Sequence, residues 1–268
     1  TLDHGTSVLS AEFSPDGVLA LTASLDHTAK IWRVESGECW RTLEGHTSYL
    51  PSGVFSPDAA LALTASYDST AKIWCVETGG CLRTLQGHLG ALRSAVFSAD
   101  AALALTASFD CTAKVWDVES GDCLRTLRGH RRVLFSAVFS PDALLALTAS
   151  GDSTAKIWNV GSGDCLRTLQ GHVGALSSAV FSRSAVLAIT TAHDRTAKIW
   201  RVESGECLRT LQGHGAYVNS AAISPNTALA LTASDDRTAK VWLVETGECL
   251  HTLGGHESAV NSVAFSLQ

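Results

Sequence analysis

The sequence predicts an all-β protein made of six copies of one four-stranded antiparallel sheet, followed by the start of a seventh copy. Three observations support this. The chain repeats every 42 residues, each repeat contains four short extended segments separated by turns, and no stretch has the 3.6-residue spacing of an amphipathic helix. The period is plainest in six tryptophans, which are Trp32, Trp74, Trp116, Trp158, Trp200 and Trp242.

The repeat that runs from His46 to Gly87 illustrates the expected strands. Its first strand ends at a Ser-Pro-Asp turn, and four of the five prolines in the chain occupy this turn. The second strand alternates in side-chain character, and turns at Asp68 and Gly79 precede the third and fourth. The expected strands are residues 50–56, 61–66, 70–76 and 81–85.

Both faces of these strands carry apolar or small residues, with Leu61 and Leu63 on one side and Ala62 and Thr64 on the other. A single four-stranded meander cannot bury both of its faces. Radial repetition solves the problem because each sheet then packs on its two neighbours and only short edges stay exposed. The sequence therefore predicts a β-propeller.

We expect a single domain over residues 1–268, and we expect the chain to be a segment of a longer protein because it does not begin with Met. The partial seventh repeat starts at Gly255-His256 and would supply one orphan inner strand that ends at Phe265-Ser266. This strand could close a six-bladed ring, compete with residues 8–13 for the same place, or belong to a truncated seven-bladed ring. An unpaired strand edge could also produce a strand-swapped oligomer. Repeats start at His4, His46, His88, His130, His172 and His214, with the partial one at His256.

The recurring markers are Gly-His, Ser-Pro-Asp, Asp-x-Thr and a strand that contains Trp, and together they resemble the WD40-repeat family over the whole chain. The Trp-Asp pair of that family occurs only at Trp116-Asp117. The resemblance implies six complete four-stranded WD40 blades plus the orphan inner strand, with a truncated seven-bladed ring as the alternative. It also implies a non-catalytic scaffold that presents one propeller face to a protein or peptide partner.

The repeated His, Thr, Asp and Trp residues could be interpreted as a hydrolase site. The resemblance instead implies a hydrogen-bonded structural set inside each blade, and six copies of a catalytic triad in one domain would be extraordinary. The Thr is the expected hydroxyl, since the Ser two positions later is replaced by Ala192 in the fifth repeat. The structural residues we single out are His46, Thr64, Asp68 and Trp74, with their equivalents His88, Thr106, Asp110 and Trp116.

Positions that differ between otherwise similar repeats are the candidates for binding. They lie just before the turn Asp and a few residues after each His, and the resemblance places them on one face around the mouth of a central channel. Exposed aromatics with an Arg have the composition of binding hot spots. The alternative is that these are neutral loop residues. The predicted face comprises Tyr49, Tyr67, Arg93, Phe109, Phe135, His193, Tyr217, Asn219 and Asp235.

The amino-acid composition indicates which classes of binding partner to expect. A net charge of −6 argues against nucleic acid, and no apolar run reaches a membrane span. The chain has no metal-binding Cys pair and no phosphate-binding loop, so we expect no metal and no cofactor. Six cysteines at one repeat position are expected to be buried thiols in a reducing, cytoplasmic setting. A structural spacer in a longer array of a multidomain signalling protein is the alternative function. An enzyme that uses His193 and Arg195 at the channel mouth is a second alternative function, which the sequence favours less.

Overall fold

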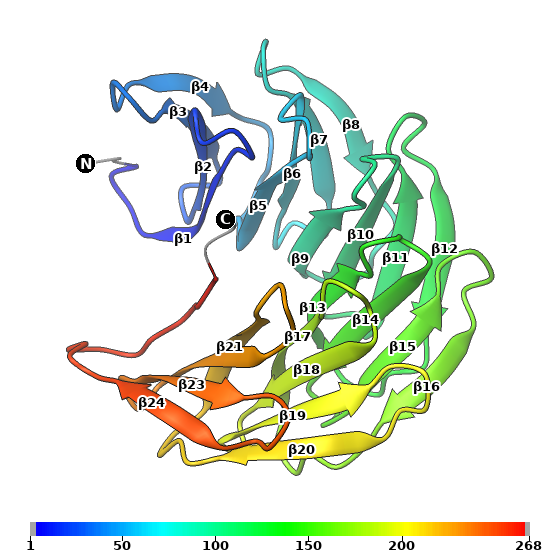
Figure 1. Ribbon diagram of the computed structural model, residues 1–268. Coiled ribbons are helices and arrows are strands. Elements are labelled where there is room, and N and C mark those ends of the chain that lie inside the picture. The colour runs from blue at the N-terminus through cyan, green and yellow to red at the C-terminus, as the bar shows by residue number, and fades with distance from the viewer. Residues whose placement is uncertain (1–3, 266–268) are drawn as a thin grey trace. The chain divides into compact units, whose positions relative to one another are not determined.

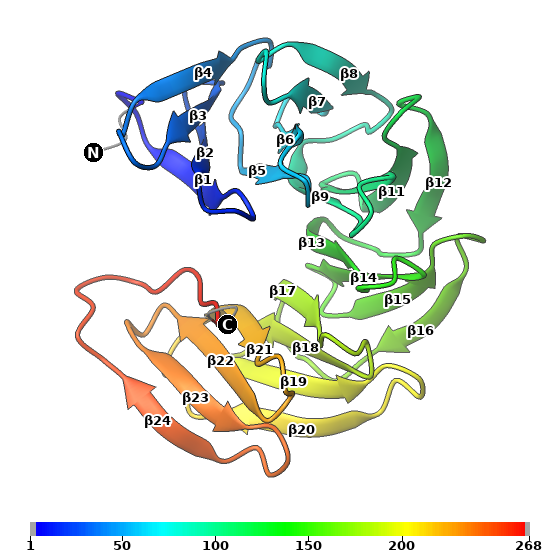
Figure 2. The same ribbon diagram turned by 45° about the horizontal axis from the view of Figure 1, so that its top comes forward.

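The computed structural model describes residues 4–265 and contains 24 strands and no helix in that range. The strands form six four-stranded sheets in which consecutive strands are neighbours (Figure 1). We call these sheets blades 1 to 6 in chain order. Every pairing within them is antiparallel, as in the sheet of β21 (Val218–Ile223), β22 (Leu229–Ser234), β23 (Ala239–Leu243) and β24 (Cys249–Leu253) (Figure 2). The predicted fold class of repeated four-stranded all-β blades is confirmed.

The chain divides into two compact units, Thr1–Arg128 and Gly129–Gln268, with three blades in each. We describe each unit by itself, and a single domain over residues 1–268 stays a prediction. The first unit contains β1 (Val8–Phe13), β2 (Leu19–Ser24), β3 (Ala29–Arg33), β4 (Cys39–Leu43), β5 (Ser52–Phe55), β6 (Leu61–Ala65), β7 (Ala71–Cys75), β8 (Cys81–Leu85), β9 (Leu92–Phe97), β10 (Leu103–Ser108), β11 (Thr112–Asp117) and β12 (Cys123–Arg128). The second contains β13 (Leu134–Phe139), β14 (Leu145–Ser150), β15 (Ala155–Asn159), β16 (Cys165–Leu169), β17 (Leu176–Phe181), β18 (Leu187–Ala192), β19 (Thr196–Arg201), β20 (Cys207–Gln212), β21 (Val218–Ile223), β22 (Leu229–Ser234), β23 (Ala239–Leu243) and β24 (Cys249–Leu253).

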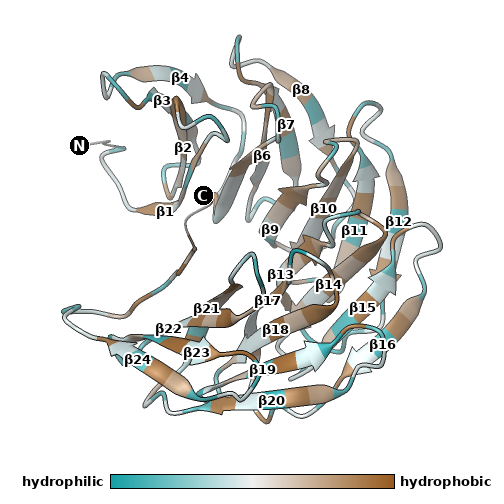
Figure 3. Cartoon of the chain, viewed as in Figure 1, coloured by the Kyte–Doolittle hydropathy of each residue, from teal (hydrophilic) through white to brown (hydrophobic). Residues whose placement is uncertain are grey.

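The second and third strands of each blade are its most buried part. In blade 2, Thr64 on β6 lies opposite Gly53 on β5 and Lys72 on β7, so β6 is paired along both edges. The fourth strand is paired along one edge only and is mostly exposed until its final Leu. Hydrophobic residues recur along the strands and hydrophilic ones gather at the turns (Figure 3). Both sets of alternating side chains on the middle strands are therefore buried, one set on each face of the sheet.

Neighbouring blades within a unit are held together by apolar side chains. Between blades 1 and 2, Leu21 and Ile31 of blade 1 pack with Phe55 and Trp74 of blade 2, and all four are at most 5% exposed. Similar clusters join blades 2 and 3 in the first unit and successive blades in the second. Burial of each large apolar side chain stabilises the fold by roughly 1.5–3 kcal/mol. This packing is the reason that both faces of a blade are apolar.

An arginine on the fourth strand makes a second link between neighbouring blades. Arg41 donates from Nε and Nη2 to the carbonyl oxygen of Glu77 at 3.0 and 2.7 Å. Arg209 donates from Nε to the carbonyl oxygen of Glu245 at 2.8 Å in the second unit. A hydrogen bond from a charged donor is worth more than a neutral one. These guanidinium groups therefore tie β4 to a turn of blade 2 and β20 to a turn of blade 6.

The prediction of buried cysteines is wrong. The repeated cysteines open the fourth strands, which have one unpaired edge and lie outside the core between blades. Their thiols contact local polar atoms instead, as Cys81 Sγ does with the carbonyl oxygen of Arg83 at 3.4 Å. The exposed free cysteines are Cys39, Cys81, Cys123, Cys165, Cys207 and Cys249.

The partial seventh repeat does not form its expected first strand within the described residues. Residues 254–265 contain no strand, although the Val260 amide donates to the Ser234 carbonyl at 3.0 Å. In blades 1 to 6 the first strand pairs with the second strand of its own repeat, whereas residues 254–265 belong to no sheet.

Between residues 4 and 265 the structure has no helix long and apolar enough to cross a membrane.

Candidate partner-binding face

A chain of buried hydrogen bonds connects the repeated side chains of blade 2. Trp74 donates from Nε1 to Thr64 Oγ1 at 2.8 Å, and Thr64 Oγ1 lies 2.9 Å from His46 Nε2. On the other side of the ring, His46 Nδ1 lies 2.7 Å from Asp68 Oδ2. A carboxylate can only accept, so Nδ1 carries the proton and Nε2 accepts from the Thr64 hydroxyl. Each polar atom in the chain therefore has a partner of the correct kind.

The same set recurs in blade 3, where His88 lies 2.8 Å from both Asp110 Oδ2 and Thr106 Oγ1, and Trp116 donates to Thr106 at 2.9 Å. It recurs in the other four blades with matching geometry. Among the described residues no buried side-chain nitrogen or oxygen lacks a hydrogen-bond partner. Buried polar groups that are fully satisfied in this way specify one arrangement of the surrounding loops.

Burial sets the charge states of this network. It lowers the pKa of His88 by more than the neighbouring carboxylate of Asp110 raises it, so this imidazole is neutral near pH 7. Burial alone would raise the pKa of Asp110, but hydrogen bonds from Thr112 and the Leu89 amide outweigh it and bring the pKa to about 2. The Thr106 hydroxyl is fully buried and bonded to Trp116 and His88. A hydroxyl in this position cannot reach a substrate in solution.

The turn Asp also positions the two loops that carry the variable residues. Asp68 Oδ2 accepts from the Thr47 amide at 3.0 Å, and Oδ1 accepts from the Thr70 amide at 2.9 Å. The Tyr67 amide donates to the Tyr49 carbonyl at 2.9 Å, which joins these loops directly. The polar network therefore holds the backbone on which the variable side chains stand.

In the first unit three of the predicted residues form a connected row of aromatic rings. Ring centroids are 6.3 Å apart between Tyr49 and Tyr67, and 5.7 Å apart between Tyr67 and Phe109. His27 extends the row, with its centroid 5.6 Å from that of Tyr49. Tyr49 and Tyr67 remain 45% and 37% exposed. We call His27, Tyr49, Tyr67 and Phe109 the aromatic row.

Two other exposed residues of the first unit stand at positions that vary between repeats. Arg93 is exposed on β9, and among the described residues it has no hydrogen bond or ion pair. Leu89 follows His88 and is 94% exposed. Sequence reasoning missed His27 and Leu89, although both occupy positions that vary between repeats. Comparing the residue after each turn Asp and the residue after each His would have found them.

The second unit carries the remaining predicted residues. His193 stacks on Tyr217 with centroids 4.4 Å apart and rings 13° from parallel. Asn219 donates from Nδ2 to Asp235 Oδ1 at 2.7 Å. Phe135 covers Gly151, where an added Cβ would lie 3.4 Å from the Phe135 ring. The predicted polar sector of this unit is thus a stacked pair beside a hydrogen-bonded pair.

Metal binding has no structural support in the described part of the chain, where no group of three or more His, Cys, Asp or Glu side chains could hold an ion. The repeated His and Asp side chains are committed to each other and to the Thr and Trp of their own blade.

Comparison with known proteins gives two findings. The family model described as "WD domain, G-beta repeat" matches residues 1–33, 37–75, 79–117, 121–159, 163–201, 205–242 and 247–267. A 48-residue segment is 42% identical to a human protein named WD repeat-containing protein 86. That segment covers 18% of this chain and 13% of the human protein. The family match extends over nearly the whole chain, whereas the match to this human protein covers a small part of it.

Proposed function

The chain belongs to the WD40-repeat family of β-propeller proteins, and on this premise we propose that it is a non-catalytic scaffold that binds a protein or peptide partner through one face of its blades. The main support for this proposal is the aromatic row, together with the exposed side chains of Arg93 and Leu89 at variable positions of the same unit. Tyr, Arg and other large side chains dominate the binding energy of interfaces. Aromatic side chains also lose little conformational entropy when they bind.

The rigidity of the face supports the same proposal. Asp68 accepts from amides in both loops of its blade, so Tyr49 and Tyr67 are held in place before a partner arrives. Preorganisation of this kind lowers the entropic cost of binding. Loops that vary on a constant scaffold are also the usual carriers of binding function.

The test is a peptide-display selection against the whole chain, followed by calorimetric affinity measurement. We expect Tyr67→Ala/Phe109→Ala to weaken the selected peptides by at least tenfold, about 1.4 kcal/mol. The matched control is Leu124→Ala/Leu166→Ala, which removes two exposed apolar side chains from outer strands. Peptides that bind both double variants like the wild type would place the binding surface elsewhere. A selection that yields no ligand would favour the spacer function.

We propose a cytoplasmic location and no nucleic-acid partner. Six exposed free thiols are compatible with a reducing compartment, where disulfides are rare. The net charge of −6 disfavours an interface with phosphate groups. Thiol titration of the protein as isolated under anaerobic conditions would test the first point, because extensive disulfide formation would argue for an oxidising compartment.

We also propose that blade 1 can associate with a second copy of the chain. Phe13 is 64% exposed although its repeat counterpart Phe55 is 5% exposed against a neighbouring blade. A pocket of about 370 Å³ beside Phe13 is lined by Trp32 and Val34. Light scattering over a concentration series should show association that Phe13→Ser weakens. A mass that is monomeric at every concentration would exclude it.

A further inference from the structure

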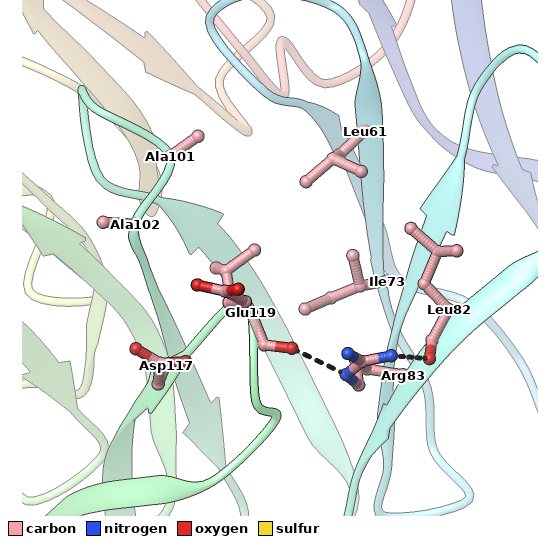
Figure 4. Close-up of a pocket in the computed structure, with 9 residues that line it drawn as sticks. Leu61, Ile73, Leu82, Arg83, Ala101, Ala102, Asp117 and Glu119 are labelled. Atoms are coloured by element: carbon pink, nitrogen blue, oxygen red, sulfur yellow. Dashed lines mark hydrogen bonds between the residues drawn. The ribbon is translucent and has the colours of Figure 1, made fainter.

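A groove in the first unit lies between blades 2 and 3, away from the aromatic row. Leu61, Ile73 and Leu82 of blade 2 form one wall, and Ala102 and Val118 of blade 3 line the other (Figure 4). The volume is about 420 Å³, and Leu82 at its edge is 46% exposed. Asp117 and Glu119 add two carboxylates to the lining. We call this space the Leu82 groove.

The preceding pair of blades carries a tryptophan at the equivalent place. Trp40 and Leu82 are each the second residue of a fourth strand, and each strand has the same register shift opposite the blade's core Trp. Trp40 packs against the apolar cluster between blades 1 and 2, which includes Ile31 and Val76. Ile31 and Val76 are the counterparts, 42 residues earlier, of two residues that line the Leu82 groove. The chain itself therefore contains an indole seated at this type of interface.

An arginine follows Trp40 and Leu82 in both strands and is held in the same way. Arg41 is held by the Glu77 carbonyl and by the Trp40 carbonyl, and its Cζ lies 4.4 Å from the centroid of the Trp40 ring. Arg83 is held in the same manner, by the Glu119 carbonyl and the Leu82 carbonyl, both at 2.8 Å. Within residues 4–265 no aromatic ring lies over Arg83. A fixed guanidinium is thus in place to stack on an aromatic ring, an attraction between the cation and the face of the ring.

The Leu82 groove differs from the corresponding places in the second unit. Position 102 is Ala in blade 3, whereas blade 5 has Val186 there. Position 117 is Asp, and its carboxylate turns back to accept from the Ser120 amide at 2.7 Å. Blade 6 has Leu243 at the latter position. The linings of these places therefore differ in sequence, although blade 6 also has a small residue, Ala228, at the position of Ala102.

We propose that the Leu82 groove is a second binding site, which takes an aromatic side chain, preferably indole, from a peptide segment that also carries a basic residue. The ring would pack on Leu61, Ile73 and Val118 and stack on Arg83, as Trp40 does with its own neighbours. The basic residue would face Asp117 and Glu119. This site is separate from the aromatic row, so its failure and the failure of the proposed face are distinguishable.

The experiment uses the capped dipeptide acetyl-Trp-Lys-amide and saturation-transfer NMR on the whole chain. We expect saturable binding near 1 mM, an affinity of about 4 kcal/mol that suits one side chain. Leu82→Trp should weaken binding at least tenfold, because its indole occupies the groove as Trp40 occupies the preceding one. Leu208→Trp places the same residue on blade 5 and should leave the affinity unchanged. Thermal midpoints of both variants check that they fold.

A second peptide makes the outcome decisive. Acetyl-Leu-Lys-amide should bind at least tenfold more weakly than the Trp peptide. The proposal is overturned if the wild type does not bind the Trp peptide, if folded Leu82→Trp binds it as well as the wild type, or if the Leu peptide binds equally well.

Discussion

Replacing Thr64 by Val tests whether the buried hydrogen-bond chain determines the stability of a blade. Val has nearly the same shape but no hydroxyl, so Trp74 Nε1 loses its acceptor at 2.8 Å and His46 Nε2 loses its donor at 2.9 Å. An unsatisfied buried polar group costs about 1–3 kcal/mol. Two such groups predict a loss of about 4 kcal/mol in the free energy of unfolding, a large part of the 5–15 kcal/mol typical of a domain.

The matched control is Ser66→Ala in the same strand. Ser66 Oγ donates to the Ser48 carbonyl and accepts from the Asp68 amide, both at 3.1 Å. Blade 5 has Ala192 at this position and still forms its network. We therefore expect this control to cost only about 1 kcal/mol. Thr64→Ser, which keeps the hydroxyl, should also cost much less than Thr64→Val.

Urea unfolding monitored by tryptophan fluorescence measures the three free energies. Repeat arrays can unfold in parts, so hydrogen exchange over residues 61–75 should accompany it and report blade 2 alone. A loss for Thr64→Val no larger than that for Ser66→Ala would refute the reasoning, because the Thr hydroxyl would then have no special role in the network.

Three further predictions concern the pH dependence of stability, the partly exposed acid Glu12 and the thiols. Burial lowers the pKa of His88, so protons bind the unfolded chain in preference and calorimetric Tm should fall as pH drops from 7 to 5; a flat profile would contradict this. Burial raises the pKa of Glu12 to about 7, more than the Phe55 backbone lowers it, so its contribution to stability is complete below about pH 4.5 and is lost as pH rises through 7. Glu12→Gln should stabilise the protein by about 1 kcal/mol at pH 8, after allowance for screening of this partly exposed group, and much less at pH 5; equal effects at both pH values would disprove it. Maleimide should label the six outer-strand cysteines of the native protein, and mass spectrometry that finds them unlabelled until urea is added would restore the interpretation as core residues.

The sequence by itself determined that six complete four-stranded repeats are present and which residues recur in all of them. These conclusions follow from repetition, because a residue that the fold requires recurs in every copy, as Thr64 and Trp74 do. A residue that the fold does not require is replaced in some copies, as Ser66 is by Ala192 in the fifth repeat. Period-two alternation then identifies strands without any knowledge of long-range contacts. Local pattern was sufficient here since each repeat specifies the same short-range structure.

Tertiary structure decided which surface of a repeat is covered. Repetition predicted that Cys81 and its equivalents share one environment, but it did not predict that they are exposed to solvent. Exposure depends on whether a strand edge is paired and whether a neighbouring blade packs over it. The same reason separates Trp40, seated between blades, from Leu82, which leaves a groove open. The joining of His27 to Tyr49 is likewise a contact between loops of successive repeats. Packing between blades, which no single repeat encodes, creates both candidate binding surfaces.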